Sequence, residues 1–404
     1  MFKSFKNFGP GLVITSAFIG PGTVTLCMLS GIEYGYSLIW CIIFSIIATC
    51  YLQEISSRIG LITKKGLGEI LTDINNKYLR WFAIIFIFLS LFVGNSAYES
   101  GNISGTSMGI ESFIGKINIM ILGVEISIIP LLIGIILIIV VGNSTYKIFE
   151  KFLIFLVSMM SLTFIVLAIL SKPNFSEIVK GLVPSVDNNN FIYVIGLIGT
   201  TVVPYNLFLH SYVTRDKWKS KSDYKKSLAD TIISIMIGGI ISLSIIITSA
   251  SSQSLSSNEI KNAIDLGNQL SPLMGSFSKI FISVGLFCAG LTSSITAPIA
   301  TSYALSGIFK YKPEWEDKNF KIISIVIILI GVIFSSLSYQ PIAIIKFAQF
   351  INGLFLPVIA VFLLWSVNKI NLMGSYVNSR AYNLFGIFII AISLLISYRS
   401  LVLI

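Results

Sequence analysis

Long apolar runs, separated by short polar segments, extend over almost the whole chain. Most of them reach the roughly 20 residues that an α-helix needs to cross a bilayer, and they lack the alternation of barrel strands. The pattern predicts an all-α integral membrane protein with about 11 transmembrane helices. These helices are expected near residues 10–31, 36–58, 80–110, 121–142, 148–170, 190–214, 227–250, 272–308, 320–338, 342–367 and 382–399.

Two of the runs are interrupted in their middle. Residues 20–23 read Gly-Pro-Gly-Thr in the first run, and residues 202–206 read Val-Val-Pro-Tyr-Asn in the sixth. Proline and glycine release backbone groups that hydrocarbon cannot satisfy, so such breaks persist where those groups line a cavity or meet a solute. Two broken helices in corresponding places indicate a transporter binding site.

The order of the runs predicts an internal symmetry. Because the breaks fall in the first and sixth runs, the first five helices can be laid over the next five in the opposite orientation. We therefore expect two inverted five-helix repeats, near residues 10–170 and 190–367, and an extra helix near residues 382–399. All of them belong to a single transporter domain over residues 1–404.

Composition and charge agree with this class and orient the protein. Only 11% of the residues are charged, whereas soluble domains carry about 25%. Lysine and arginine concentrate in the loops on the side of the amino terminus, which predicts a cytoplasmic amino terminus and an external carboxy terminus. The formal charge of +10 is therefore explained by orientation rather than by nucleic-acid binding. Abundant Ile, Lys and Asn suggest a bacterial inner membrane.

Short motifs occur in register along nearly the whole chain. They are residues 9–11, 19–23, 34–40, 181–185, 202–211, 230–231 and 290–294, and Gln349 with residues 356–357. Together they resemble the natural-resistance-associated macrophage protein (Nramp) transporters. The resemblance implies a fold shared with sodium-coupled amino-acid symporters and, in most members, proton-coupled import of manganese, iron or similar divalent metals.

The metal-binding positions implied by the resemblance are changed in this chain. The aspartate and asparagine of the family's first break correspond to Gly20 and Thr23. The helix-six methionine corresponds to Val203, and a neighbouring carbonyl donor to Thr200. Loss of the soft thioether points away from transition metals. We therefore expect no ordinary manganese or iron site, but a wider site that suits a hydrated ion such as Mg²⁺, which usually keeps several waters.

Several polar side chains remain as candidates. The resemblance places Asn206 and Gln349 at the central cavity, where their other role is to satisfy the broken backbone. Glu99 is a carboxylate at membrane depth, which by default marks a pathway or a paired charge. It is a candidate ligand for a metal ion or a proton, one turn from Asn102, which occupies the family's usual acidic position. His210, the only histidine, matches a histidine of the family's proton path, with hydrogen-bonded packing as the alternative.

Three other charged residues are interpreted as peripheral. Lys346 is expected to extend its ammonium to the membrane surface. Glu54 and Arg58, one turn apart near the inner end of the second run, are interpreted as an interfacial helix pair.

Two functions stay open from the sequence. The first is secondary-active transport of a divalent cation, hydrated Mg²⁺ in preference to Mn²⁺ or Fe²⁺, with proton coupling undecided. The second is transport of a small organic solute or anion, since the half-helix amino termini after the breaks present unpaired amides. A sensor or an inactive relative is a weaker third interpretation. No motif for catalysis or for a cofactor is present, so the expected partners are the transported solute and the bilayer, with the chain acting as a monomer.

Overall fold

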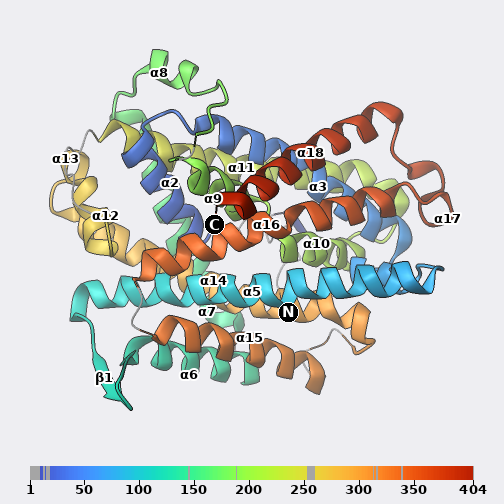
Figure 1. Cartoon of the computed structure of the whole chain (residues 1–404), viewed down its shortest axis with the longest axis horizontal. Coiled ribbons are helices and arrows are strands. Elements are labelled where there is room, and N and C mark those ends of the chain that lie inside the picture. Colours follow the sequence, from blue (N-terminus) through green and yellow to red (C-terminus); the bar gives the residue numbers. More distant parts are fainter. Residues whose placement is uncertain are drawn as a thin grey trace.

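The computed structural model describes residues 10–11, 14, 19–143, 146–187, 189–252, 260–312, 314, 317–337 and 340–403 (Figure 1). Helices account for most of this part of the chain, which confirms the all-α membrane class. The helices are α2 (Pro21–Tyr34), α3 (Ile39–Thr63), α4 (Leu67–Thr72), α5 (Lys77–Ile114), α6 (Ile128–Asn143), α7 (Tyr146–Leu170), α8 (Phe175–Lys180), α9 (Phe191–Thr201), α10 (Pro204–Lys217), α11 (Tyr224–Ser251), α12 (Ala263–Gln269), α13 (Ser271–Met274), α14 (Phe277–Phe309), α15 (Lys318–Ser336), α16 (Pro341–Val367), α17 (Ile370–Met373) and α18 (Arg380–Leu403).

Each predicted transmembrane run contains a helix in the described part of the chain. Among the described residues, 8 helices are long and apolar enough to cross a membrane when α9 and α10 are taken together. Shorter apolar stretches lie in α6 and α7. Helix α2 begins at Pro21, inside the first predicted break of residues 20–23, because proline is favoured at the first position of a helix.

The run predicted at 121–142 does not begin as a helix. Strand β1 (Asn118–Ile121) pairs antiparallel with β2 (Val124–Ser127), and α6 starts only at Ile128. The two residues between the strands, Leu122 and Gly123, have φ angles of 51° and 82°, as a two-residue hairpin turn requires. Most of the strand and turn residues are apolar, like the helix that follows them, so hydropathy alone does not separate the hairpin from α6.

Helix α5 is the central element of the bundle. It crosses the middle of Figure 1, with α16 on one side and α15 and α6 on the other, and it also packs on α14. The broken pair α9 and α10 contacts α3, while α2 packs on α11. At Gly199 in α9, an added β-carbon would lie 2.1 Å from the Gln349 carbonyl oxygen. Glycine at this position therefore lets α9 approach the backbone of α16, next to the second break.

Candidate functional site

The two breaks meet in the interior of the bundle. Helix α9 ends at Thr201 and α10 begins at Pro204, so Val202 and Val203 form the non-helical connection. Thr23, in the first turn of α2, and Thr200, in the last turn of α9, are both fully buried. Their hydroxyl oxygens lie 2.9 Å apart and form a hydrogen bond. This bond joins the amino-terminal end of α2 to the carboxy-terminal end of α9. The helix dipole is positive at the first of these ends and negative at the second.

We expect this hydroxyl pair to contribute measurably to stability. Thr23→Val and Thr200→Val keep the shape of the side chain, and each should lower the free energy of unfolding by about 0.5–1.5 kcal/mol. The double variant should lose less than the sum of the two, because both changes remove the same bond. Chemical unfolding in detergent measures all three variants.

The matched control is Thr163→Val in α7, whose hydroxyl bonds only the Met159 carbonyl of its own helix. Strict additivity of the Thr23 and Thr200 changes would show that the two hydroxyls do not depend on each other.

The space beside Gly20 is filled by hydroxyl groups. An added β-carbon at Gly20 would lie 2.8 Å from Oγ of Ser293 in α14 and 3.2 Å from the hydroxyl oxygen of Tyr98 in α5. Both side chains are buried, and the Ser293 hydroxyl has no hydrogen-bond partner in the described part of the chain. The first break is therefore surrounded by neutral oxygens, with no room for a longer side chain at residue 20 unless neighbours move.

Gln349 and Asn206 bring amide groups to the breaks. An added β-carbon at Gly22 would lie 2.0 Å from Nε2 of Gln349, so the Gln349 side chain passes directly over the first turn of α2. Asn206 lies in the first turn of α10 and is 1% exposed. Within the described residues, Oε1 of Gln349 and both side-chain polar atoms of Asn206 lack hydrogen-bond partners. Buried amides without partners are uncommon, and they are suited to bind water or a polar solute.

Glu99 lies on a different face of α5 from the breaks. Its side chain is fully buried, and an added β-carbon at Gly331 of α15 would lie 2.6 Å from Cγ of Glu99. Asn102 donates from Nδ2 to Oε2 of Glu99 over 3.4 Å. The structure therefore joins Glu99 to Asn102 and α15, while the preceding residue, Tyr98, reaches Gly20. Among the described residues, the Glu99 carboxylate hydrogen-bonds to Asn102 and not to a break, and its role as a metal ligand stays a prediction.

His210 is held between α3 and α11 and is fully buried. Its Nδ1 hydrogen-bonds to Oε1 of Gln53 over 2.8 Å, and its Nε2 lies 3.5 Å from the Thr231 hydroxyl oxygen. Both ring nitrogens thus face side chains of neighbouring helices, which agrees with the packing interpretation. A role in proton movement stays a prediction.

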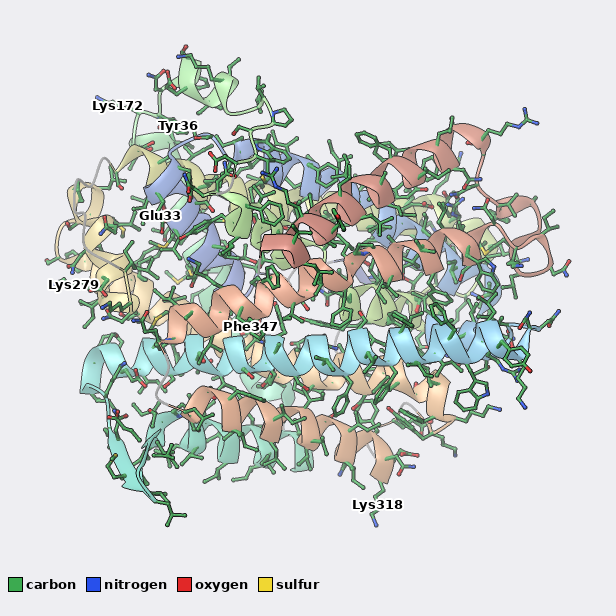
Figure 2. The ribbon with its side chains drawn as sticks, in the orientation of Figure 1. Glu33, Tyr36, Lys172, Lys279, Lys318 and Phe347 are labelled. Carbon is green, nitrogen blue, oxygen red and sulfur yellow. The ribbon has the colours of Figure 1, made fainter. Side chains whose placement is uncertain are left out.

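Lys346 has a partner on a neighbouring helix, and its extension to the membrane surface stays a prediction. Its Nζ donates to the Tyr193 hydroxyl over 2.9 Å and lies 4.3 Å from the centroid of the same ring. The Tyr193 hydroxyl in turn donates to the exposed carboxylate of Glu33. This outer latch of Glu33, Tyr193 and Lys346 connects α2, α9 and α16. In Figure 2 the next residue, Phe347, is labelled on α16, and its side chain is 59% exposed.

The Glu54 and Arg58 pair is part of the interior, not an interfacial pair as predicted. The two residues are 2% and 7% exposed, and Nε of Arg58 lies 3.0 Å from Oε1 of Glu54. Arg58 also donates to the Tyr376 carbonyl over 3.1 Å and to the Asn378 side chain. Tyr224 donates to Glu54 over 2.9 Å. The pair is buried because the segment before α18 folds back over the carboxy-terminal half of α3.

Two contributors to the site were not identified from the sequence. Tyr98 directly precedes Glu99 and belongs to none of the sequence motifs, so nothing in the sequence separates it from the other tyrosines. Ser293 lies inside the motif at residues 290–294. The resemblance identified this helix but assigned no role to the Ser293 hydroxyl. Across the described residues, no three side chains of His, Cys, Asp or Glu come close enough together to hold a metal ion. The site is therefore built from neutral oxygen and nitrogen atoms.

Comparison with known proteins identifies the family. A family model described as natural resistance-associated macrophage protein-like matches residues 11–403. A divalent metal cation transporter, MntH, of Brucella suis is 26% identical over 317 residues, which are 76% of this chain and 67% of the relative. MntH of Klebsiella pneumoniae is 24% identical over 393 residues, covering 95% of this chain and 91% of the relative.

Two solved structures share the fold. A mutant of the Eremococcus coleocola manganese transporter has a TM-score of 0.77 at 18% identity, covering 99% of this chain and 87% of the other. MhsT in complex with L-phenylalanine has a TM-score of 0.61 at 15% identity, covering 97% and 98%. The relatives are transporters rather than enzymes, as the sequence predicted. Because the family model matches nearly its entire length, this chain belongs to the Nramp family of multi-pass membrane transporters.

Proposed function

We propose that the protein is a secondary-active transporter of a divalent cation that keeps most of its water shell, as Mg²⁺ does. The relatives named above are divalent metal cation transporters, which supports the cargo class. The observation that carries the finer proposal is the filling of the Gly20 position by the hydroxyls of Ser293 and Tyr98. Hydroxyl and amide oxygens can accept hydrogen bonds from the waters of a hydrated ion, whereas a dehydrated ion needs carboxylates or many oxygen ligands.

The substrate path would run between the two breaks. Thr23, Thr200, Gln349 and Asn206 would contact the hydration shell, while Gly20 and Val203 offer no side-chain ligand that would replace its waters. In this proposal Glu99 does not touch the ion. It supplies negative charge from the other side of Tyr98 and, with Asn102, is the candidate site of proton binding, because buried carboxylates in membrane proteins commonly serve as proton relays.

The proposal is tested with purified protein in liposomes that contain dyes for Mg²⁺ or Mn²⁺. We expect Mg²⁺ uptake to exceed Mn²⁺ uptake, and Glu99→Gln to lower Mg²⁺ uptake at least about tenfold, because a buried charge of the pathway is removed. The control is Glu177→Gln, which changes a carboxylate with 47% of its side chain exposed. Absence of flux for every divalent cation would overturn the proposal.

A small organic solute is the second candidate cargo. It is favoured by the position of the Glu99 side chain beside Asn102 and α15. The main dipoles at the breaks are then the amino-terminal ends of α2 and α10 and the carboxy-terminal end of α9. Such a set suits a carboxylate or a zwitterion, and the structure of MhsT holds L-phenylalanine on a similar fold. Thermal stabilisation by amino acids, in a protein without cation flux, would select this candidate.

The orientation is part of the same proposal. The distribution of lysine and arginine supports a cytoplasmic amino terminus, and the bacterial relatives support an inner-membrane location. In this orientation the outer latch lies toward the outside of the cell, and the buried pair of Glu54 and Arg58 lies toward the cytoplasmic end of α3.

A further inference from the structure

An apolar groove opens at the end of the bundle where α3 and α9 begin and α18 ends. Its volume is about 680 Å³, and its walls come from α3, the segment 182–186, α9 and α18. Ile43, Phe44 and Phe191 form part of one wall, with Ile392 of α18 opposite. The groove is separate from the central breaks, and none of the residues assigned to transport line it.

The groove has polar donors at one end only. Arg399 is the one charged residue among the described residues that line it. The guanidinium carbon of Arg399 lies 5.4 Å from the centroid of the Phe191 ring. Trp40 also lines the groove, and in the part of the chain that the structure describes its indole Nε1 is buried without a hydrogen-bond partner.

These donors lie close to the ends of their helices. Trp40 is the second residue of α3, and Arg399 lies in the last part of α18. In the proposed orientation both residues lie near the external surface of the inner membrane, at the depth of the lipid phosphates. The groove therefore runs from an interfacial cationic end into the hydrocarbon region.

We propose that this groove binds an anionic phospholipid, with an acyl chain between α3 and α18 and the phosphate at Arg399. A guanidinium forms short, bidentate hydrogen bonds with phosphate oxygens. The Trp40 indole can donate to an ester or phosphate oxygen of the same lipid, as tryptophans do at membrane interfaces.

Charge complementarity identifies the class of lipid. An acyl chain that moves from the bilayer into the groove passes from one apolar medium to another, so it gains little from burial. Selectivity must then come from the head group. Phosphatidylglycerol brings one negative charge to Arg399, whereas phosphatidylcholine also brings a quaternary ammonium that the arginine repels.

The test is thermal unfolding of the full chain in mild detergent, with added phosphatidylglycerol, phosphatidylcholine or inorganic phosphate. We expect phosphatidylglycerol to raise the melting temperature by several degrees more than phosphatidylcholine, and phosphate alone to have no effect. Arg399→Gln should abolish the preference. Lys279→Gln should retain it, because Lys279 lies at the same end of the molecule on α14, away from the groove (Figure 2).

A second variant tests the acyl chain. Ile392→Trp fills the groove and leaves the charge of Arg399 in the sequence, and it should abolish stabilisation by phosphatidylglycerol. Retention of the full preference in Arg399→Gln, or of the full stabilisation in Ile392→Trp, would overturn the proposal. Equal stabilisation by inorganic phosphate would also overturn it, since it would assign the site to a free anion. None of these outcomes depends on the transported cargo.

Discussion

Replacing Gly22 by alanine should lower Mg²⁺ uptake at least about tenfold while the protein remains folded. The new β-carbon would lie 2.0 Å from Nε2 and 2.6 Å from Cδ of Gln349. The Gln349 side chain is flexible at this end, so it can rotate away at modest cost, and alanine stabilises a helix relative to glycine by about 0.5–1 kcal/mol. Rotation would, however, remove the amide from the first break, and transport depends on that contact in our proposal. Uptake into liposomes and thermal unfolding measure the two effects separately.

Two variants make the Gly22 result specific. Gly142→Ala in α6 is the control, because an added β-carbon there meets nothing within 4 Å. In the double variant Gly22→Ala with Gln349→Ala, the crowding disappears and the amide is absent. Its stability should return to that of the wild type, and its uptake should stay low. Uptake restored by the double variant would mean that crowding alone, and not loss of the amide, stops transport.

Replacing Arg58 by methionine should lower the free energy of unfolding by about 3–5 kcal/mol, because it leaves the Glu54 carboxylate buried without its partner. The contacts of Arg58 with Tyr376 and Asn378 would be lost as well. Removing both charges, with Glu54→Met added, should recover much of this loss, since an apolar pair of similar volume needs no compensation. Chemical unfolding in detergent measures the difference between the single and double variants.

An exposed ion pair supplies the control for Arg58. Lys65 and Asp73 lie 2.5 Å apart with 44% and 36% of their side chains exposed. Lys65→Met should therefore cost no more than about 1 kcal/mol. A similar small cost for Arg58→Met would contradict the view that the segment before α18 is held on α3 by a buried charge pair.

The fold was largely predictable because its main signals are local. A proline inside an apolar run predicts a break without reference to the rest of the chain, and the helices α2 and α10 begin at Pro21 and Pro204. Hydropathy likewise located the helical regions. It failed at residues 121–127, where the conformation of Leu122 and Gly123 decides between a hairpin and a longer helix.

The site was less predictable because its contacts join distant segments. The spacing of Glu54 and Arg58 revealed a pair, but its burial depends on residues more than 300 positions later in the chain, such as Asn378 at a separation of 320. The partner of Lys346 lies 153 residues away. The direction of Glu99 could not be inferred from α5 alone, because residues on several faces of this central helix are buried and polar.

In the proposed function, the outer latch would change the ratio of the two conformations between which a transporter alternates. Glu33 is exposed, so the interaction is screened by salt and contributes on the order of 0.5 kcal/mol. A free energy of this size changes a two-state ratio by about twofold. In the proposed transport cycle, the latch would therefore favour the joined arrangement of α2, α9 and α16 only about twofold, so that these helices could separate on each cycle.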